Sequence, residues 1–372
     1  MTVEIVILQP QLAPDYEQVA LRDLDQHSTD EETVLKGLRP MGEARALLEA
    51  IPGVAITYAP YSDTDLERGA RRDSMVYRQP PPSKPIEPAV LEALKKAEVI
   101  LSVDLPVNLI GLAPKLKWVH TISAGIDQAY GSGLDKTDKV VFTNQGPLMS
   151  RGIAEQALAG ILALSKRFPH FEAARPRREW LRNETLIARG KTVGIFGLGQ
   201  IGQHLAKMCK ALDMRVIGIK RNASEPVPNV DALFPTERRV EVAAQSDFLV
   251  LASALTPDTL RLLGEKEIAA MKPGAFVINV GRGKLIDEPA LIRALREKRL
   301  GGAHLDCFWT EPNPPDNELW DMPNVIFTPH NSGTQEGIFA ENMKVFHDNL
   351  LRYLKNEPLR HVKPPRELSQ WY

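Results

Sequence analysis

The sequence predicts an α/β protein of two doubly wound domains, each with a parallel β-sheet. Short β-rich runs alternate with helix-like stretches in two successive series, and a longer apolar helical stretch at about 150–168 separates them. Such alternation favours a parallel sheet covered by helices. A chain of 372 residues is also long enough for more than one domain. We place the first domain at 1–147, completed by the final stretch 335–372, and the second at 148–334.

The first series begins at the N-terminus. Its β-rich runs are Val3–Leu8, Val54–Tyr58, Val99–Val103, Trp118–Ile122 and Val140–Thr143. Helix-like stretches at Gly42–Ile51 and Ala89–Ala97 lie between these runs. Four prolines in Ser74–Pro88 before its last residue remove backbone donors, so we expect a surface loop there.

The separating stretch is predicted to be a helix and a hinge. Ile153, Ala157, Ile161 and Leu164 recur at helical spacing, and Pro169 predicts the end of the helix. The β-rich runs of the second series follow, at Thr192–Phe196, Arg215–Lys220, Phe248–Ala252, Phe276–Asn279, Gly302–Leu305 and Val325–Phe327. A last helix is expected at Gln335–Lys355, with one apolar stripe that returns to the first domain.

Composition and charge exclude several classes of protein. With 43% hydrophobic and 25% charged residues the chain has ordinary globular composition. Its formal net charge of −1 supplies no global field for phosphate backbones or anionic lipid, so we expect no nucleic-acid and no membrane partner. The two cysteines, Cys209 and Cys307, form no disulfide framework or zinc pattern, and we expect no metal. The start MTVEIVILQP is unlike a signal peptide, so a cytoplasmic setting is the expectation.

A glycine fingerprint follows the first β-rich run of the second series. The spacing Gly197-x-Gly199-x-x-Gly202 stands between an apolar strand and a helical pattern, the context that dinucleotide binding requires. The first glycine permits a tight turn, the second lets the backbone approach a pyrophosphate, and the third permits close packing of helix on strand. A glycine-rich turn without a ligand is the alternative. The context favours a dinucleotide.

The end of the next run indicates which dinucleotide. An acidic residue there would bind the free ribose 2′-hydroxyl of NAD. The chain instead has Lys220, Arg221 and Asn222, whose cationic and amide groups suit a 2′-phosphate. We therefore expect NADP(H) to be favoured, with NAD(H) possible if the two basic residues are merely solvated.

Three ionisable residues each follow a strand of the second series. They are Arg282, Glu311 and His330. Ligands of open α/β sheets bind at the carboxyl ends of strands. A carboxylate beside an imidazole favours its protonated form, which can donate a proton, and a guanidinium can bind a carboxylate and polarise a carbonyl. Each residue alone could be an ordinary loop residue. Together they are the groups needed to reduce a 2-oxo acid.

These motifs in order resemble the D-2-hydroxyacid dehydrogenase family. The resemblance rests on the glycine fingerprint, Asn279-Val-Gly-Arg282-Gly, Leu305-Asp306 with Glu311-Pro312, and Thr328-Pro-His330, and it runs from about Ala97 to the end of the final helix. It implies a Rossmann cofactor domain inserted in a flavodoxin-like substrate domain, and a homodimer. It also implies that Arg282, Glu311 and His330 are catalytic.

The resemblance implies further contacts. The segment Ser123, Ala124, Gly125 and Ile126, with Arg282, would bind the substrate carboxylate. The residues implied or argued above to contact the cofactor are Gly197, Leu198, Gly199, Gln200, Ile201, Gly202, Lys220, Arg221, Asn222, Ala254, Thr259, Val280, Gly281, Asp306 and Gly333. The segment after the histidine, Asn331-Ser-Gly333, departs from the family pattern, and the N-terminal 95 or so residues match no pattern we can place.

The alternatives lie inside and outside this family. Formate dehydrogenases resemble the pattern but have Gln at the Glu311 position, and the strand-end acid suited to a phosphoglycerate dehydrogenase using NAD is absent. A different class, the dehydrogenase-like nucleotide-sensing corepressors, uses the same fold to bind partners. The favoured reading is a reductase of a small 2-oxo acid, with glyoxylate and hydroxypyruvate as first guesses by family analogy.

Overall fold

The computed structural model describes residues 2–13 and 42–365, and the chain divides into two compact units. The first unit comprises Met1–Leu148 and Glu336–Tyr372, and the second Met149–Gln335. Among the described residues, each unit contains one parallel sheet, of five strands in the first and seven in the second. The predicted α/β class with two parallel sheets is confirmed.

The first sheet has the strand order β2-β1-β3-β4-β5, which is the flavodoxin-like order. Its strands are β1 (Val3–Ile7), β2 (Val54–Tyr58), β3 (Val99–Ser102), β4 (Trp118–Thr121) and β5 (Val141–Asn144). Residues 42–49 are helical, and the other helices of this unit are α3 (Asp65–Val76), α4 (Pro88–Lys96), α5 (Leu109–Leu112) and α12 (Ile338–Leu354). Every residue of β3 and β4 is buried, as expected for strands covered on both faces.

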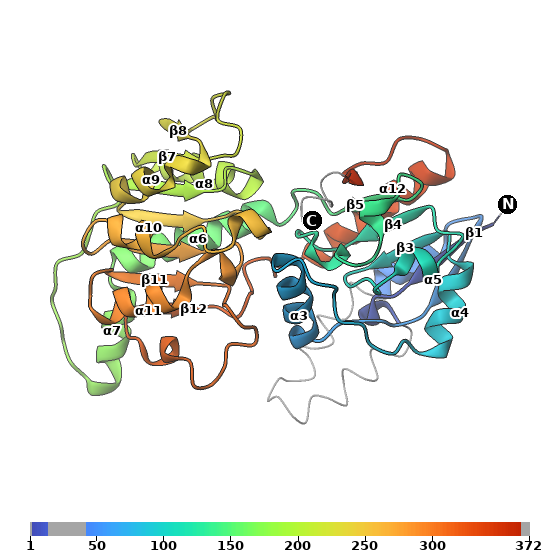
Figure 1. Cartoon of the computed structure of the whole chain (residues 1–372), viewed down its shortest axis with the longest axis horizontal. Coiled ribbons are helices and arrows are strands. Elements are labelled where there is room, and N and C mark those ends of the chain that lie inside the picture. The colour runs from blue at the N-terminus through green and yellow to red at the C-terminus, as the bar shows by residue number, and fades with distance from the viewer. Residues whose placement is uncertain (1, 14–41, 366–372) are drawn as a thin grey trace. The chain divides into compact units, whose positions relative to one another are not determined.

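The final helix α12 packs in the core of the first unit, although the whole second unit separates it in sequence from the other elements (Figure 1). Met343, Phe346 and Leu350 of its apolar stripe are buried against β1, β3 and β4. The ring of Phe346 stacks on Trp118 of β4 with centroids 5.2 Å apart. This contact joins two parts of the chain more than 200 residues apart, so the first unit needs both of its segments.

The second sheet has the strand order β12-β11-β10-β9-β6-β7-β8. Its strands are β6 (Thr192–Phe196), β7 (Arg215–Ile219), β8 (Ala232–Phe234), β9 (Phe248–Leu251), β10 (Phe276–Asn279), β11 (Gly302–Leu305) and β12 (Val325–Phe327). Numbered by their order in the chain, the strands lie in the order 3-2-1-4-5-6-7. The strand order therefore reverses between the neighbouring strands β6 and β9, and Rossmann folds bind their ligands at such a switch point.

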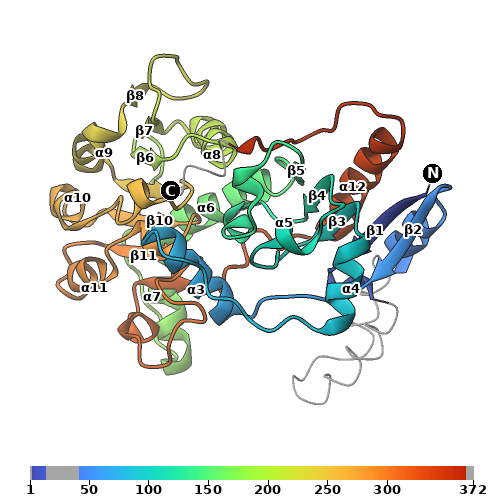
Figure 2. The same ribbon diagram turned by 45° about the vertical axis from the view of Figure 1, so that its right-hand side comes forward.

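Helices cover both faces of the second sheet. Figure 2 shows α9, α10 and α11 on one side, and α6 and α8 on the other. The bounds are α6 (Ser150–Ser165), α8 (Gln200–Ala211), α9 (Arg239–Gln245), α10 (Glu265–Ala270) and α11 (Glu288–Arg296). The buried residues of α6 and α8 form one core with β6, β7, β9 and β10. Helices thus cover the faces of the sheet, and its carboxyl edge is left to the connecting loops.

The predicted loop Ser74–Pro88 is wrong over its first three residues, because α3 extends to Val76. Thr64 and Glu67 begin this helix with a capping box, in which each side chain accepts a hydrogen bond from the other residue's backbone N–H. The helix contains few apolar residues, and its buried residues include the charged Arg71. Hydrophobic periodicity therefore does not reveal this helix.

Pro169 is at the start of a helix and not at the end of one. The helix α6 ends at Ser165, Arg167 takes a left-handed backbone conformation with φ of 57°, and α7 (Phe168–Ala174) begins with Pro169 in its first turn. Proline is well tolerated there because the first N–H groups of a helix have no helical partner. The short edge strand β8 was not predicted, and α12 begins three residues later than expected. The hinge role of α6 stays a prediction.

Within the two described ranges, none of the helices combines the length and the apolar character needed to cross a membrane. Both cysteines are buried, and neither forms a disulfide.

Candidate active site

The predicted site residues of the second unit lie in the loops, and in the first turn of α8, at one edge of its sheet. Because the seven strands run parallel, their carboxyl ends meet at this edge. The glycine turn follows β6, the basic residues follow β7, and Arg282 follows β10. Glu311 and His330 follow β11 and β12. The fold therefore gathers at one edge of one sheet residues that are more than 130 positions apart.

The glycine turn has the geometry of a phosphate-binding turn. Gly197 has φ of +104°, which L side chains rarely adopt. A Cβ on Gly202 would lie 2.2 Å from the carbonyl oxygen of Gly197, so only glycine lets α8 approach the turn this closely. A Cβ on Gly199 would meet nothing within 4 Å. The space in front of Gly199 opens at the N-terminus of α8, whose unpaired N–H groups suit the pyrophosphate of a dinucleotide.

The basic residues after β7 are accessible to a ligand. Lys220 is half-buried, and its N–H donates to the carbonyl oxygen of Phe234. Arg221 and Asn222 are exposed. The side-chain oxygen of Asn222 accepts hydrogen bonds from the N–H and hydroxyl of Ser224, at 3.1 and 2.6 Å, which fixes the turn. An anion at this strand end would meet two cationic side chains.

The remaining predicted cofactor residues differ in exposure. Thr259 donates to the carbonyl oxygen of Ala254 at 2.8 Å and closes the loop after β9. Leu198 and Val280 are buried in the core. Gln200 and Ile201 are the first two residues of α8, Gly281 lies between β10 and Arg282, and a Cβ on Gly333 would lie 3.1 Å from the sulfur of Met149. Their contacts with a cofactor stay a prediction.

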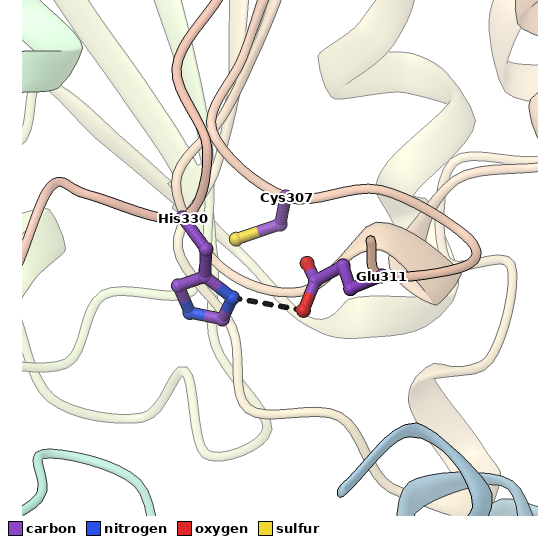
Figure 3. Close-up of side chains that lie close together, drawn as sticks. All are labelled: Cys307, Glu311 and His330. Atoms are coloured by element: carbon purple, nitrogen blue, oxygen red, sulfur yellow. Dashed lines mark hydrogen bonds and ion pairs between the residues drawn. The ribbon is translucent and has the colours of Figure 1, made fainter. Parts of the chain in front are cut away.

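His330 and Glu311 form a direct hydrogen bond (Figure 3). Nδ1 of His330 lies 3.0 Å from Oε2 of Glu311. The other carboxylate oxygen, Oε1, accepts from the N–H of Phe308 at 3.1 Å, so the acid is held from two directions. The Glu311 side chain is 14% exposed and that of His330 37% exposed. The pair therefore has an anchored carboxylate and an imidazole that a ligand can reach.

Asp306 fixes the backbone that carries His330. Its carboxylate is completely buried and accepts hydrogen bonds from the hydroxyl of Thr328 at 2.6 Å and from the N–H groups of Asn331 at 2.8 Å and Ser332 at 3.1 Å. Its carbonyl oxygen also accepts from the His330 N–H at 2.8 Å. His330 itself has a left-handed φ of 53°. Asp306 thus positions the histidine segment, a role the sequence does not reveal.

Arg282 lies on the loop next to that of Glu311. Asn279, at the end of β10, accepts from the Gly281 N–H at 3.1 Å and donates to the Arg282 carbonyl oxygen at 2.9 Å. A Cβ on Gly283 would fall 1.8 Å from the carbonyl oxygen of Phe308, so the two loops touch through backbone. The structure brings His330 and Glu311 into contact and Arg282 onto the adjoining loop.

The predicted carboxylate-binding segment belongs to the first unit, where it follows β4. The hydroxyl of Ser123 donates to the carbonyl oxygen of Gly125 at 2.9 Å, and Asn144 donates to that of Ala124 at 3.4 Å. Ile126 precedes a short 3₁₀ turn that begins at Asp127. The segment is again at the carboxyl end of a parallel strand.

Sequence reasoning missed the position of Cys307. The sequence analysis assigned Cys307 to no site, whereas the thiol lies beside Glu311 and His330. The candidate ligand atoms of these three residues are within 4.8 Å of one another. The ring of His304 instead faces Gln156 and Thr328, and burial lowers the pKa of His304. Cys307 and Asp306 are adjacent in the loop after β11, and no sequence signal shows which of the two side chains faces Glu311 and His330.

The fold and this edge define a dinucleotide-dependent oxidoreductase. Residues 158–332 match the family model of the NAD-binding domain of D-isomer-specific 2-hydroxyacid dehydrogenases. The chain is 32% identical over 279 residues to D-3-phosphoglycerate dehydrogenase of Methanocaldococcus jannaschii, covering 73% of this chain but only 53% of that longer relative. It is also 32% identical to glyoxylate reductase of Thermococcus litoralis, over 74% of this chain and 86% of that protein.

A solved structure covers the whole chain. It is a D-isomer-specific 2-hydroxyacid dehydrogenase from Xanthobacter autotrophicus Py2 in complex with NADPH and MES, with a TM-score of 0.72, 26% identity and full coverage of both chains. The protein belongs to the D-isomer-specific 2-hydroxyacid dehydrogenase family and is an NAD(P)-dependent oxidoreductase. The predicted family and fold are confirmed. The alternative of a corepressor is not favoured, because these relatives are named as enzymes.

Proposed function

We propose that this enzyme reduces a small 2-oxo acid to the 2-hydroxy acid. The observation on which this rests is the His330–Glu311 hydrogen bond at the carboxyl edge of the nucleotide-binding sheet. A nicotinamide cofactor, when bound, supplies the hydride that is added to the carbonyl carbon. His330 donates the proton that the carbonyl oxygen then needs, and Glu311 orients the imidazole through its hydrogen bond to Nδ1.

The carboxylate of the substrate needs its own partners. We assign this role to Arg282 and to the backbone N–H groups of residues 123–126. A guanidinium binds a carboxylate through two parallel hydrogen bonds, and the same positive charge stabilises negative charge on the neighbouring carbonyl oxygen. The hydrogen bonds of Asn279 hold the Arg282 loop in place for this task.

An activity screen tests the proposal. Oxidation of NADPH is followed with glyoxylate, hydroxypyruvate, 3-phosphohydroxypyruvate, pyruvate, phenylpyruvate and branched 2-oxo acids. We expect turnover of small members, with glyoxylate and hydroxypyruvate first, as a relative is named glyoxylate reductase.

His330→Ala should lower kcat by about 10²-fold or more, with cofactor binding retained. His170→Ala, on α7, is the matched control. Turnover by His330→Ala equal to that of the wild type would refute the assignment.

We propose further that NADPH is preferred over NADH, with NAD(H) as the weaker cofactor. Lys220, Arg221 and Asn222 support this, because no carboxylate stands at the end of β7 to repel a 2′-phosphate. The ratio of kcat/KM for NADPH and NADH measures the preference. Arg221→Ala should reduce this ratio, whereas Arg215→Ala, at the opposite end of the same strand, should not. A wild-type preference for NADH would contradict the proposal.

We propose that the enzyme is a homodimer in solution. Exposed apolar side chains gather in the segment after α6: Phe168 is 57%, Trp180 88% and Ile187 68% exposed. Single exposed apolar residues are ordinary, and the proposal rests on the occurrence of several within one segment of 20 residues. Light scattering after gel filtration should give twice the chain mass, and Trp180→Ser should shift the mass toward that of the monomer. A wild-type mass of one chain would exclude the dimer.

A further inference from the structure

Cys307 is a buried thiol beside the proposed catalytic pair, and the proposed reaction does not use it. It directly follows Asp306, and its Sγ donates to the carbonyl oxygen of Gly281 at 3.3 Å. Figure 3 shows the thiol, the Glu311 carboxylate and the His330 ring directed toward one another. The candidate ligand atoms of the three residues lie within 4.8 Å of one another.

A thiolate sulfur, an imidazole nitrogen and a carboxylate oxygen are the ligands that Zn²⁺ prefers in proteins. With bonds of about 2.0–2.3 Å, tetrahedral ligands of zinc lie about 3.5 Å apart. His330 Nδ1 and Glu311 Oε2 are already 3.0 Å apart. The sulfur lies within 4.8 Å of both of these atoms. Because the imidazole is partly exposed, rotation of the His330 side chain can adjust these separations to those of a metal site.

The charge and the coordination number also fit zinc. One thiolate and one carboxylate neutralise a divalent cation, and three protein ligands leave a fourth position for water, the pattern of open zinc sites. The sulfur selects against Mg²⁺ and Ca²⁺, which take oxygen ligands. Cys307 and Glu311 come from one loop and His330 from the next, so each ligand is positioned by the ends of neighbouring strands.

We propose that Cys307, Glu311 and His330 form a binding site for Zn²⁺ that inhibits the enzyme. The thiol proton is released to solvent as the metal–sulfur bond forms. The metal takes the nitrogen lone pair and the carboxylate of the pair that otherwise delivers the proton, so metal binding and catalysis exclude each other. This inhibition rests on the proposed function, whereas the binding of the metal does not.

Direct metal binding is tested with Co²⁺ as a spectroscopic substitute for Zn²⁺. The wild-type protein should develop a thiolate-to-cobalt charge-transfer absorption in the near ultraviolet, which Zn²⁺ abolishes. Cys307→Ser should lack this band, and the matched control Cys209→Ser should retain it, because Cys209 is buried in α8 away from this edge. Glu311→Gln should bind Co²⁺ about tenfold or more weakly. A band that survives in Cys307→Ser would overturn the proposal.

The functional arm uses the substrate found in the screen. Zn²⁺ should inhibit wild-type turnover, and a chelator should restore it. Cys307→Ser should keep basal activity but need about tenfold or more Zn²⁺ for half-inhibition. Equal sensitivity of Cys307→Ser and the wild type would exclude the site, and Cys307→Ala replaces the serine variant if that one does not fold. If no 2-oxo acid is turned over, the proposed function fails, and the cobalt band still decides on the metal site.

Discussion

At the scale of single residues, the site depends on a completely buried carboxylate. Asp306 is completely buried and accepts from Thr328, Asn331 and Ser332, on both sides of His330. Asp306→Ala leaves these donors without an acceptor, at about 1–3 kcal/mol for each buried group. We expect a large loss in the free energy of unfolding, measured with urea, and a fall in kcat because His330 is no longer held.

The matched control is the exposed acid Asp258, in the loop after β9. Asp258→Ala should change the free energy of unfolding by less than about 0.5 kcal/mol. Asp306→Asn keeps one acceptor oxygen, so its free energy of unfolding should lie between those of Asp306→Ala and Asp258→Ala. If Asp306→Ala unfolds like the wild type, the carboxylate does not position the histidine segment.

Much of this site follows from residue types and their order. Arg282, Glu311 and His330 each come after an apolar run, and parallel strands must bring such positions to one edge. The contacts of Asp306 and Cys307 do not follow. They lie on adjacent positions after β11, yet one side chain supports the histidine backbone and the other faces the catalytic pair. Loop conformation decides this, and the local sequence does not encode it.

At the scale of elements, the glycine turn makes two separable demands. A Cβ on Gly202 would lie 2.2 Å from the Gly197 oxygen, so Gly202→Ala must push α8 off the strand. Overpacking of this kind costs about 1–3 kcal/mol. A Cβ on Gly199 meets no protein atom within 4 Å, but it occupies the space that the pyrophosphate needs. We therefore expect Gly202→Ala to lower stability, and Gly199→Ala to weaken NADPH binding at unchanged stability.

Titration of the two variants with NADPH, followed by its fluorescence, and thermal unfolding without ligand separate the two effects. Gly199→Ala that binds NADPH as tightly as the wild type would show that the turn does not carry the cofactor. If Gly199→Ala is less stable than the wild type without ligand, the added methyl group contacts other protein atoms, and the space in front of Gly199 is not free.

Elements that bury a continuous apolar face were predictable, and those that begin with capping signals were not. The central strands β6 and β9, for example, follow apolar runs because every one of their residues is buried in a sheet that helices cover on both faces. Half of the residues of α3 are charged, and the helix begins with the capping box of Thr64 and Glu67. The helix α7 depends on a left-handed residue at Arg167 and on Pro169. Here the local hydrogen bonds, and not hydrophobic periodicity, determine the helix.

At the scale of the whole molecule, each unit buries a histidine whose neutral form is favoured by burial. Burial lowers the pKa of His120, in the first unit, to about 3. Burial likewise lowers the pKa of His304 in the second. His120 is enclosed by Trp118 and Phe346, and its Nδ1 lies 2.8 Å from the hydroxyl of Thr143. Protonation of His120 or His304 therefore lowers the stability of the folded unit that contains it.

This sets the acid sensitivity of the first unit. The unfolded chain binds a proton at His120 below about pH 6.5, its ordinary pKa, whereas the folded unit resists protonation until about pH 3. The unfolded state therefore holds more protons in this window, so the free energy of unfolding falls as the pH drops from about 6.5 toward 3, by up to about 1.4 kcal/mol per pH unit. Above the window the contribution is complete and independent of pH.

His120→Gln removes the titrating group while keeping an amide that can bond with Thr143, so it should flatten this dependence. Urea unfolding between about pH 7.5 and about pH 5 measures it, with the first unit followed by fluorescence from Trp118. Over this range the free energy of unfolding should fall less in the variant than in the wild type. The two slopes against pH should differ by up to the contribution of about one proton. His347→Gln, a partly exposed histidine on α12 of the same unit, should keep the wild-type slope. Identical slopes for His120→Gln and the wild type would mean that the buried imidazole is protonated as readily in the folded unit as in the unfolded chain, and that its burial does not govern the response to acid.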